Sequence, residues 1–68
     1  MKNKFATKLK ELREECGLSQ TQLGKKLNVT QAGVAKWEAG TREPSLDVLL
    51  AIAQYFNVTT DYLLGLED

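Results

Sequence analysis

Apolar residues recur at helical spacing along most of the chain. Phe5, Leu9, Leu12 and Cys16 are four, three and four residues apart, which places them on one face of a helix. The same spacing predicts four further helices, at about residues 20–27, 30–39, 45–56 and 60–64. No segment of useful length alternates with the period of two that a half-buried strand shows. The pattern therefore predicts an all-α chain, with residues 1–68 forming a single domain of five helices.

Residues that start and end helices lie between these apolar runs. Ser19 and Gln22 fit a capping box, in which each side chain accepts the backbone N–H of the other residue. Thr30, Ser45 and Thr59 precede the third, fourth and fifth helices, as N-cap residues do. Residues that tolerate a left-handed backbone follow the first, second, third and fifth helices: Gly17, Asn28, Gly40 and Gly65. We expect tight turns at these positions and one longer loop over residues 41–44.

One apolar face of each helix is expected to form the core. In the fourth helix this face is a stripe of five residues: Leu46, Leu49, Leu50, Ala53 and Phe56. Cys16 lies on the apolar face of the first helix, and the chain has no histidine that could activate its thiol. We therefore expect Cys16 to be a buried structural residue and not a nucleophile.

Composition argues against several classes of protein. The longest apolar run, Val48–Ala53, has six residues, whereas a membrane span requires about 20. One cysteine and no histidine provide neither a disulfide framework nor the commonest metal ligand. No apolar segment follows the N-terminal lysines, so a signal peptide is not expected. The sequence thus predicts a cytoplasmic protein without metal or cofactor. It also predicts that the protein is not an enzyme, because it shows neither an activated nucleophile nor a glycine-rich phosphate loop.

Charge is divided unevenly along the chain although the net charge is zero. All nine basic residues lie in residues 1–42 together with four acidic residues, which leaves a charge of +5 there. Residues 43–68 hold the other five acidic residues and no basic residue, which gives −5. This division suggests a polyanionic partner for the first part, although chance can also segregate surface charges.

Residues 20–39 fit the layout of a helix-turn-helix, in which a tight turn joins two short helices. This layout needs a small residue where the helices cross, a turn residue with positive φ, and apolar anchors in the second helix. Gly24, Asn28, Val34 and Trp37 meet these needs in that order. An ordinary helical hairpin would need the same residues.

The outer face of the predicted third helix favours the DNA-binding interpretation. At about 100° per residue, Gln31, Ala32, Ala35 and Lys36 point away from the apolar anchors, and this face holds no carboxylate. Glutamine suits adenine, lysine suits guanine, and alanine suits the thymine methyl group. Gly33 costs about 1 kcal/mol relative to alanine inside a helix, and small residues here would let the backbone approach a duplex closely.

Five segments of the chain, Leu18–Gln20, Lys25–Leu27, Val34–Glu38, Arg42–Ser45 and Asp61–Gly65, resemble the XRE family of Cro and repressor domains of phages and bacteria. The resemblance extends from about residue 5 to residue 65. It implies a five-helix lambda-repressor-like helix-turn-helix domain whose third helix enters the major groove. It further implies a transcriptional regulator, most often a repressor that binds a palindromic operator as a homodimer. Glycine at position 24 and asparagine at position 28 depart from the family's usual alanine and glycine.

The resemblance also implies roles for individual residues. Contacts with double-stranded DNA are implied for seven residues: Gln20, Thr30, Gln31, Ala32, Lys36, Thr41 and Arg42. Arg13 and Glu38 are implied to form a structural ion pair. The short fifth helix has more apolar residues than one face can bury, and the family places its two-fold interface in this region. We therefore expect a dimer interface at Pro44, Tyr62 and Leu66.

Two alternatives remain open at the level of the sequence. A protein-interaction module, such as an antitoxin or antirepressor, is favoured by the zero net charge. A restriction–modification controller protein shares the fold and differs only in gene context. No ligand pocket is expected, so regulation would act through another domain or through a regulatory protein partner.

Overall fold

The computed structural model describes residues 3–67, which form five α-helices and, within that range, no strand. The helices are α1 (Phe5–Glu15), α2 (Gln20–Leu27), α3 (Gln31–Ala39), α4 (Leu46–Phe56) and α5 (Thr60–Leu64). The predicted all-α fold of five helices is confirmed. Lys2 of the basic half and Asp68 of the acidic half lie outside the described residues.

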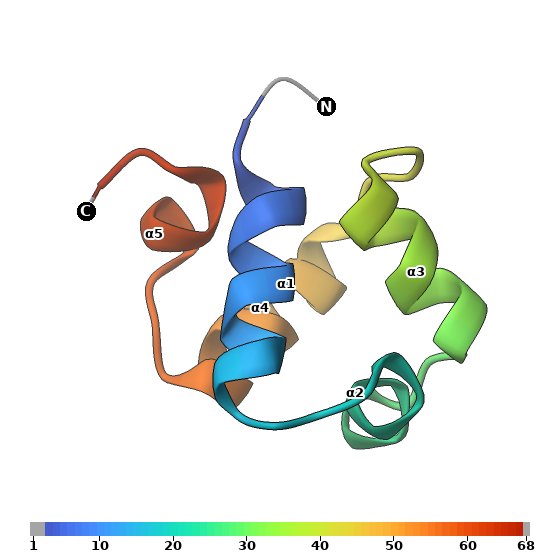
Figure 1. The fold of residues 1–68 in the computed structure, drawn as a ribbon. Coiled ribbons are helices and arrows are strands. Elements are labelled where there is room, and N and C mark those ends of the chain that lie inside the picture. The colour runs from blue at the N-terminus through green and yellow to red at the C-terminus, as the bar shows by residue number, and fades with distance from the viewer. Residues whose placement is uncertain (1–2, 68) are drawn as a thin grey trace.

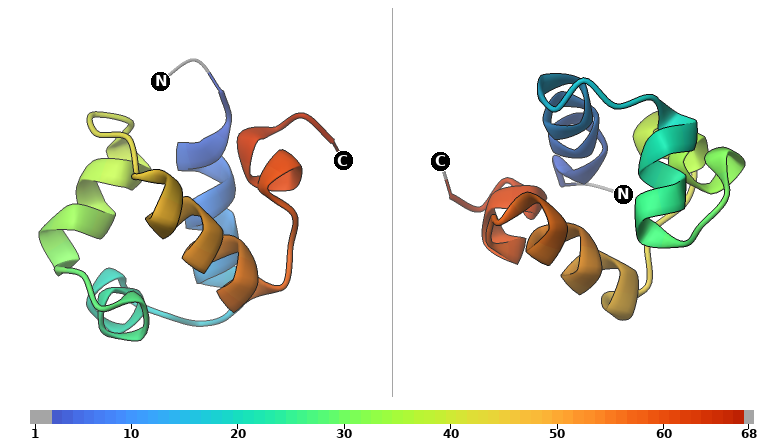
Figure 2. Two further views of the ribbon diagram at one scale, coloured as in Figure 1. Left: turned by 180° about the vertical axis from the view of Figure 1, so that it is seen from behind. Right: turned by 90° about the horizontal axis from the view of Figure 1, so that it is seen from below.

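The helices surround one small core (Figure 1). α1 packs against α3 on one side and α5 on the other, α2 packs mainly against α3, and α4 contacts α2 and α5. Viewed from behind, α4 crosses the molecule in front of α1 (Figure 2, left). Every helix contributes to the buried apolar cluster, which comprises Phe5, Leu9, Leu23, Val34, Trp37, Ile52, Ala53 and Leu63. Each helix is therefore held by its apolar side chains.

The ends of the helices follow the predicted capping residues. Ser19 Oγ accepts the Gln22 N–H at 3.0 Å, and Gln22 Oε1 accepts the Ser19 N–H at 2.8 Å, which completes the capping box. Thr30, Ser45 and Thr59 each accept a backbone N–H from the first turn of the following helix. Left-handed backbone ends α2 to α5 at Asn28, Gly40, Asn57 and Gly65, with φ of 60°, 76°, 56° and 77°. The predicted helix starts and turns are thus confirmed.

The prediction that Cys16 is buried was wrong, because its side chain is exposed. α1 ends at Glu15, and Cys16 is the C-cap residue of this helix. The buried part of α1 lies in its first half, at Phe5 and Leu9. Gly17 follows with φ of 69° and turns the chain, so that Leu18 packs against the core. Cys16 continues the apolar spacing of α1 but lies at the end of the helix, beyond the part that is buried.

The predicted apolar stripe of α4 was only partly right. Leu46 is 77% exposed and Leu50 is 53% exposed, whereas Ile52, which the stripe omitted, is fully buried beside Ala53. α4 is apolar on most of its circumference, so more than one set of residues has helical spacing. Packing against the other helices selects the face around Ile52 and leaves Leu46 and Leu50 in solvent.

Candidate nucleic-acid interface

α2 and α3 approach each other closely at Gly24. A β-carbon at this position would lie 2.7 Å from the Val29 carbonyl oxygen, a distance that real β-carbons essentially never show. Gly24 is itself buried, and its carbonyl accepts the Val29 N–H at 2.8 Å. The small residue that the sequence placed at the helix crossing is therefore required by the backbone of the turn.

The outer face of α3 presents three of the four predicted residues to solvent, whereas the fourth, Ala35, is half buried. Val34 is fully buried and Trp37 is 6% exposed, whereas Gln31, Ala32 and Lys36 are exposed. This division holds because the buried anchors are three residues apart and occupy one side of the helix. α3 therefore offers a glutamine, an alanine and a lysine at its surface.

The first turn of α3 lies beside the first turn of α2, which brings two predicted site residues together. Gln31 Nε2 donates to Gln20 Oε1 at 2.7 Å. Thr30 caps α3, and its hydroxyl oxygen accepts the Gly33 N–H at 3.1 Å. Thr30 is exposed as well, so the cap leaves its side chain accessible.

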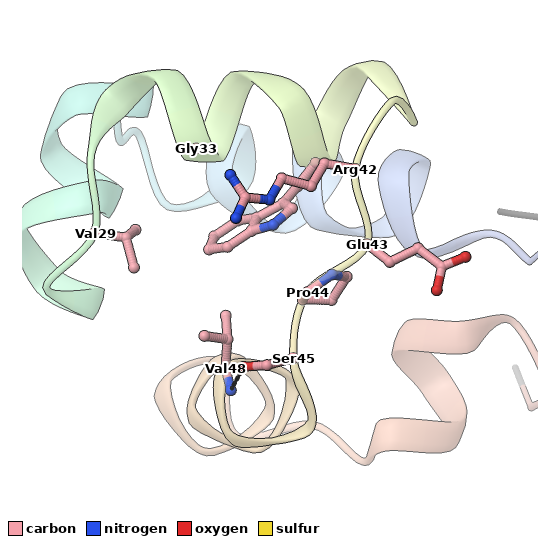
Figure 3. A pocket seen from close by; sticks show the side chains of 8 residues that line it. Val29, Gly33, Arg42, Glu43, Pro44, Ser45 and Val48 are labelled. Atoms are coloured by element: carbon pink, nitrogen blue, oxygen red, sulfur yellow. Dashed lines mark hydrogen bonds between the residues drawn. The ribbon is translucent and has the colours of Figure 1, made fainter.

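The loop after α3 carries the remaining predicted DNA contacts. Thr41 Oγ1 donates to the Lys36 carbonyl at 3.2 Å, and its backbone N–H donates to the same oxygen at 3.1 Å. Arg42 lines a surface cavity of about 250 Å³ that also contacts Gly33, Trp37 and Pro44 (Figure 3). The Arg42 side chain extends from the loop back along α3 (Figure 3). Thr41 and Arg42 are both exposed to solvent.

Arg13 and Glu38 form a double hydrogen bond between α1 and α3. Arg13 Nε donates to Glu38 Oε2 at 2.7 Å, and Arg13 Nη2 donates to Glu38 Oε1 at 3.0 Å. Their side chains are 11% and 4% exposed, respectively. The third guanidinium nitrogen, Nη1, donates to the Leu18 carbonyl at 2.7 Å. The hydrogen bond with Glu38 raises the pKa of Arg13 above its ordinary value, so the guanidinium stays charged.

A further contact on Glu38 was not foreseen from the sequence. Gln20 Nε2 donates to Glu38 Oε1 at 3.2 Å. Gln20, one of the seven residues expected to contact DNA, therefore uses its amide within the protein and is half buried. No pattern in the sequence indicates this contact, because it depends on how α2 and α3 are placed.

The residues predicted for a dimer interface differ in exposure. Leu66 is 72% exposed, whereas Pro44 and Tyr62 are half buried. Pro44 lines the cavity beside Arg42, and the Tyr62 ring lies 4.6 Å from Lys8 Nζ of α1. Leu46 and Leu50 of α4 are more exposed than Pro44 and Tyr62.

The residues described by the structure show no group of three or more side chains suited to hold a metal ion. Within the same range, no helix is both long and apolar enough to cross a membrane.

Sequence comparisons find relatives among helix-turn-helix transcriptional regulators. The HTH-type transcriptional regulator ImmR of Bacillus subtilis (strain 168) is 38% identical over 61 residues, which cover 90% of this chain and 48% of that protein. The HTH-type transcriptional activator BcrR of Enterococcus faecalis is 39% identical over 64 residues, which cover 94% of this chain and 31% of that protein. The chain thus spans less than half the length of these two relatives.

Solved structures show the same arrangement of helices. The P22 c2 repressor, crystallised with the synthetic operator 9T, matches with a TM-score of 0.86 and 27% identity over 93% of this chain and 96% of that chain. The restriction–modification controller protein C.AhdI from Aeromonas hydrophila matches with a TM-score of 0.78 and 33% identity over 88% of this chain and 87% of that chain. A helix-turn-helix family model matches residues 9–63. The resemblance seen in the sequence is confirmed, and the chain belongs to the XRE family of helix-turn-helix proteins.

Proposed function

We propose that this chain binds double-stranded DNA sequence-specifically and acts as a transcriptional repressor, with α3 in the major groove. The observation that supports this most strongly is the exposed face of α3, which presents Gln31, Ala32 and Lys36 and no carboxylate. Glu38, the acidic residue of this helix, is turned inward and paired with Arg13. Glutamine and lysine at the surface match the hydrogen-bonding edges of adenine and guanine.

The distribution of charge supports the same orientation. Lys25, Lys26 and Lys36 are exposed on α2 and α3. Asp61 lies in the first turn of α5, where it also interacts favourably with the helix dipole. α2 and α3 lie on the opposite side of α1 from α5 (Figure 2, right). A duplex placed against α3 would therefore meet the basic part of the molecule.

Contacts with phosphates would come from both sides of the recognition helix. Thr30 lies at its N-terminal end, and Thr41 and Arg42 lie just beyond its C-terminal end. Among the described residues, the Arg42 side chain has neither a salt bridge nor a hydrogen bond that holds it along the cavity. It would therefore be able to turn away from the cavity and reach a phosphate. Such contacts position the helix, and the side chains of α3 read the bases.

We further propose that the chain binds a palindromic operator as a homodimer. One domain of this size offers few base contacts, and two half-sites about one helical turn apart double them. Three exposed leucines are available for this contact: Leu66, which belongs to the expected interface, and Leu46 and Leu50 of α4. Pro44, two residues before Leu46 in the chain, and Tyr62 would lie at its edge.

The similarity to C.AhdI favours a second candidate, a controller protein of a restriction–modification system. That function uses the same DNA-binding surface, so gene context would separate the two candidates.

Selection of bound duplexes from a random DNA pool tests the proposal. We expect a two-fold symmetric motif, and a mobility-shift titration over a salt series should show the steep loss of affinity that accompanies counterion release. Gln31→Ala and Lys36→Ala should each relax the preference at one or two positions per half-site, by about 1–3 kcal/mol. Arg42→Ala should weaken all duplexes alike and make the salt dependence shallower. Absence of any enriched motif would instead favour a protein-interaction module.

A further inference from the structure

We propose that the surface cavity between α3 and α4 binds a small carboxylic acid with one aromatic ring, which pairs with Arg42 and thereby weakens DNA binding. The site and the class of ligand follow from the cavity and the residues that line it. The effect on DNA rests on the proposed function, because that function assigns Arg42 to a phosphate.

The cavity exists because different neighbours hold α3 and α4. α3 packs mainly against α1 and α2, whereas α4 packs against α2 and α5. Residues 40–45 connect the two helices, and the cavity of about 250 Å³ lies beside this loop (Figure 3). Its lining comes from the turn between α2 and α3, from α3, from the loop and from α4. No ligand pocket was expected from the sequence, because no local pattern brings these segments together.

Four apolar side chains form walls that the fold holds in place. Trp37 is 6% exposed, and Val29, Pro44 and Val48 are half buried. Gly33 contributes only backbone to the lining. An apolar cavity of about 150 Å³ holds one benzene molecule, whereas the pockets of drug-sized ligands begin at about 300 Å³. The volume therefore suits a ligand with one ring, and the indole of Trp37 gives that ring an aromatic surface.

The charge at the cavity selects an anion. Arg42 lines the cavity, and no acidic side chain in the part of the chain that the structure describes forms a salt bridge with it. Glu43 lines the cavity as well, but its carboxylate points away from Val29 and Val48 (Figure 3). Ser45 Oγ accepts the Val48 N–H at 3.2 Å and keeps its own O–H for a ligand. Because a guanidinium forms two parallel hydrogen bonds with a carboxylate, an aromatic carboxylate matches both the walls and the charge.

The Arg42 side chain cannot serve this ligand and a DNA phosphate at the same time. It extends back along α3 beside the cavity (Figure 3), whereas a phosphate contact requires it to turn outward. A bound carboxylate holds the guanidinium at the cavity and removes one phosphate contact from each copy of the chain. Gln31 and Lys36 do not line the cavity. The ligand therefore lowers the affinity for all duplexes alike and leaves the preferred motif unchanged.

Phenylacetate is a suitable probe, and Trp37 reports its binding because it is the single tryptophan of the chain. We expect a saturable change in Trp37 fluorescence, with a dissociation constant on the order of 1 mM for a ligand of this size. Phenylacetamide has the same shape without the charge and should bind at least fivefold more weakly, and acetate should give no saturable change. In NMR spectra of the same titration, the largest shifts should fall at the Trp37 indole N–H and the backbone amides of Gly33 and Arg42.

Val48→Phe tests the place of binding, because an added ring fills the cavity. It should abolish the fluorescence change while the circular dichroism spectrum remains that of the folded chain. Gln54→Phe is the matched control, since Gln54 is exposed on the same helix and does not line the cavity. If Val48→Phe fails to fold, Arg42→Gln carries the test, because it should bind phenylacetate no better than phenylacetamide.

The effect on DNA is measured with a duplex selected by the unsubstituted chain. In a mobility-shift titration, about 10 mM phenylacetate should weaken binding at least threefold relative to the same concentration of acetate, which matches the ionic strength. The motif selected in the presence of phenylacetate should be unchanged. Val48→Phe, or Arg42→Gln in its place, should bind the duplex equally in both salts.

The outcomes separate the cavity from the proposed function. A fluorescence change that does not saturate, equal binding of phenylacetamide, or unchanged binding in Val48→Phe would each overturn the ligand site. Saturable binding without an effect on the affinity for DNA would overturn the competition for Arg42 and leave the site standing. Failure to select any duplex would overturn the proposed function, while the titration of the DNA-free protein would still decide on the site.

Discussion

Two glycines inside helices differ in what the fold requires of them. At Gly24 a β-carbon would lie 2.7 Å from the Val29 carbonyl oxygen and 3.3 Å from the Thr30 carbonyl carbon. At Gly33 the nearest neighbour would be Thr30 Oγ1 at 3.4 Å, an ordinary contact. Because glycine costs about 1 kcal/mol relative to alanine in a helix interior, its presence at each position needs a reason. The backbone of the turn provides that reason only at Gly24.

We predict that Gly24→Ala and Gly33→Ala change stability in opposite directions. Gly24→Ala should lower the free energy of unfolding by about 1–3 kcal/mol, because the backbone must shift to admit a methyl group. Gly33→Ala should raise it by up to about 1 kcal/mol, since the methyl group fits and helix propensity improves. Chemical denaturation followed by circular dichroism measures both. Equal stability of the two variants would contradict the crossing geometry of α2 and α3.

The more stable Gly33→Ala variant should nevertheless bind DNA less well. If the glycine serves the close approach of α3 to a duplex, a methyl group at this position displaces the helix from the groove. We expect at least a fivefold loss of affinity for the selected operator in a mobility-shift titration. Unchanged affinity would show that the glycine at position 33 does not serve a close approach of α3 to DNA.

The Arg13–Glu38 pair should behave as one unit in stability measurements. Removing one partner leaves a charge that is almost buried, which costs about 3–5 kcal/mol. Arg13→Leu with Glu38→Leu should therefore cost much less than the sum of the two single changes. A double-mutant cycle in urea measures this coupling, and additive losses would show that the pair is no more than a surface contact.

At the scale of the helices, capping could be predicted from the sequence because it is local. Ser19 meets Gln22 within one turn, and the cap bonds of Thr30, Ser45 and Thr59 also span three residues. When most of the circumference of a helix is apolar, its own sequence does not determine which face is buried. In α4 periodicity favoured Leu46 and Leu50, and packing buried Ile52.

The two faces of α4 should respond differently to truncation. Ile52→Ala should lower the free energy of unfolding by about 2–5 kcal/mol, because it leaves a cavity in the core. Leu50→Ala should change the stability of the monomer by no more than about 0.5 kcal/mol, because its side chain is already in solvent. Chemical denaturation at low protein concentration compares the free energies of unfolding of the two variants. A large loss of stability in Leu50→Ala would mean that the Leu50 side chain is buried in solution.

The part of the candidate site that lies on one helix, α3, could be predicted from the sequence. Gln31 and Lys36 could be placed on the outer face of α3 because Val34 and Trp37 fix the inner face. The bond between Gln20 and Glu38 joins residues 18 apart in different helices, and no local pattern reports it. The same holds for Lys8 above the Tyr62 ring, which depends on α5 returning to α1.

At the scale of the whole molecule, the exposed apolar side chains lie in the acidic half of the chain. Leu46, Leu50, Tyr55 and Leu66 are all in residues 43–68, and the reading face of α3 is in the basic half. A small domain with a core of eight buried apolar residues gains little by leaving leucines in solvent. Contact with a second copy through these leucines would bury them and leave α3 free for DNA.

The last prediction tests this assembly. Leu46→Asp and Leu66→Asp should leave the monomer folded, because both side chains are already exposed. Each should shift the monomer–dimer equilibrium toward the monomer in sedimentation equilibrium, since a charge would be buried at the contact. Each should also abolish cooperative binding to a full operator, while binding to an isolated half-site changes little. Ala51→Asp is the control, because Ala51 is exposed on α4 and points about 100° away from Leu50. Equal loss on full and half-site DNA would instead place these leucines at the DNA surface.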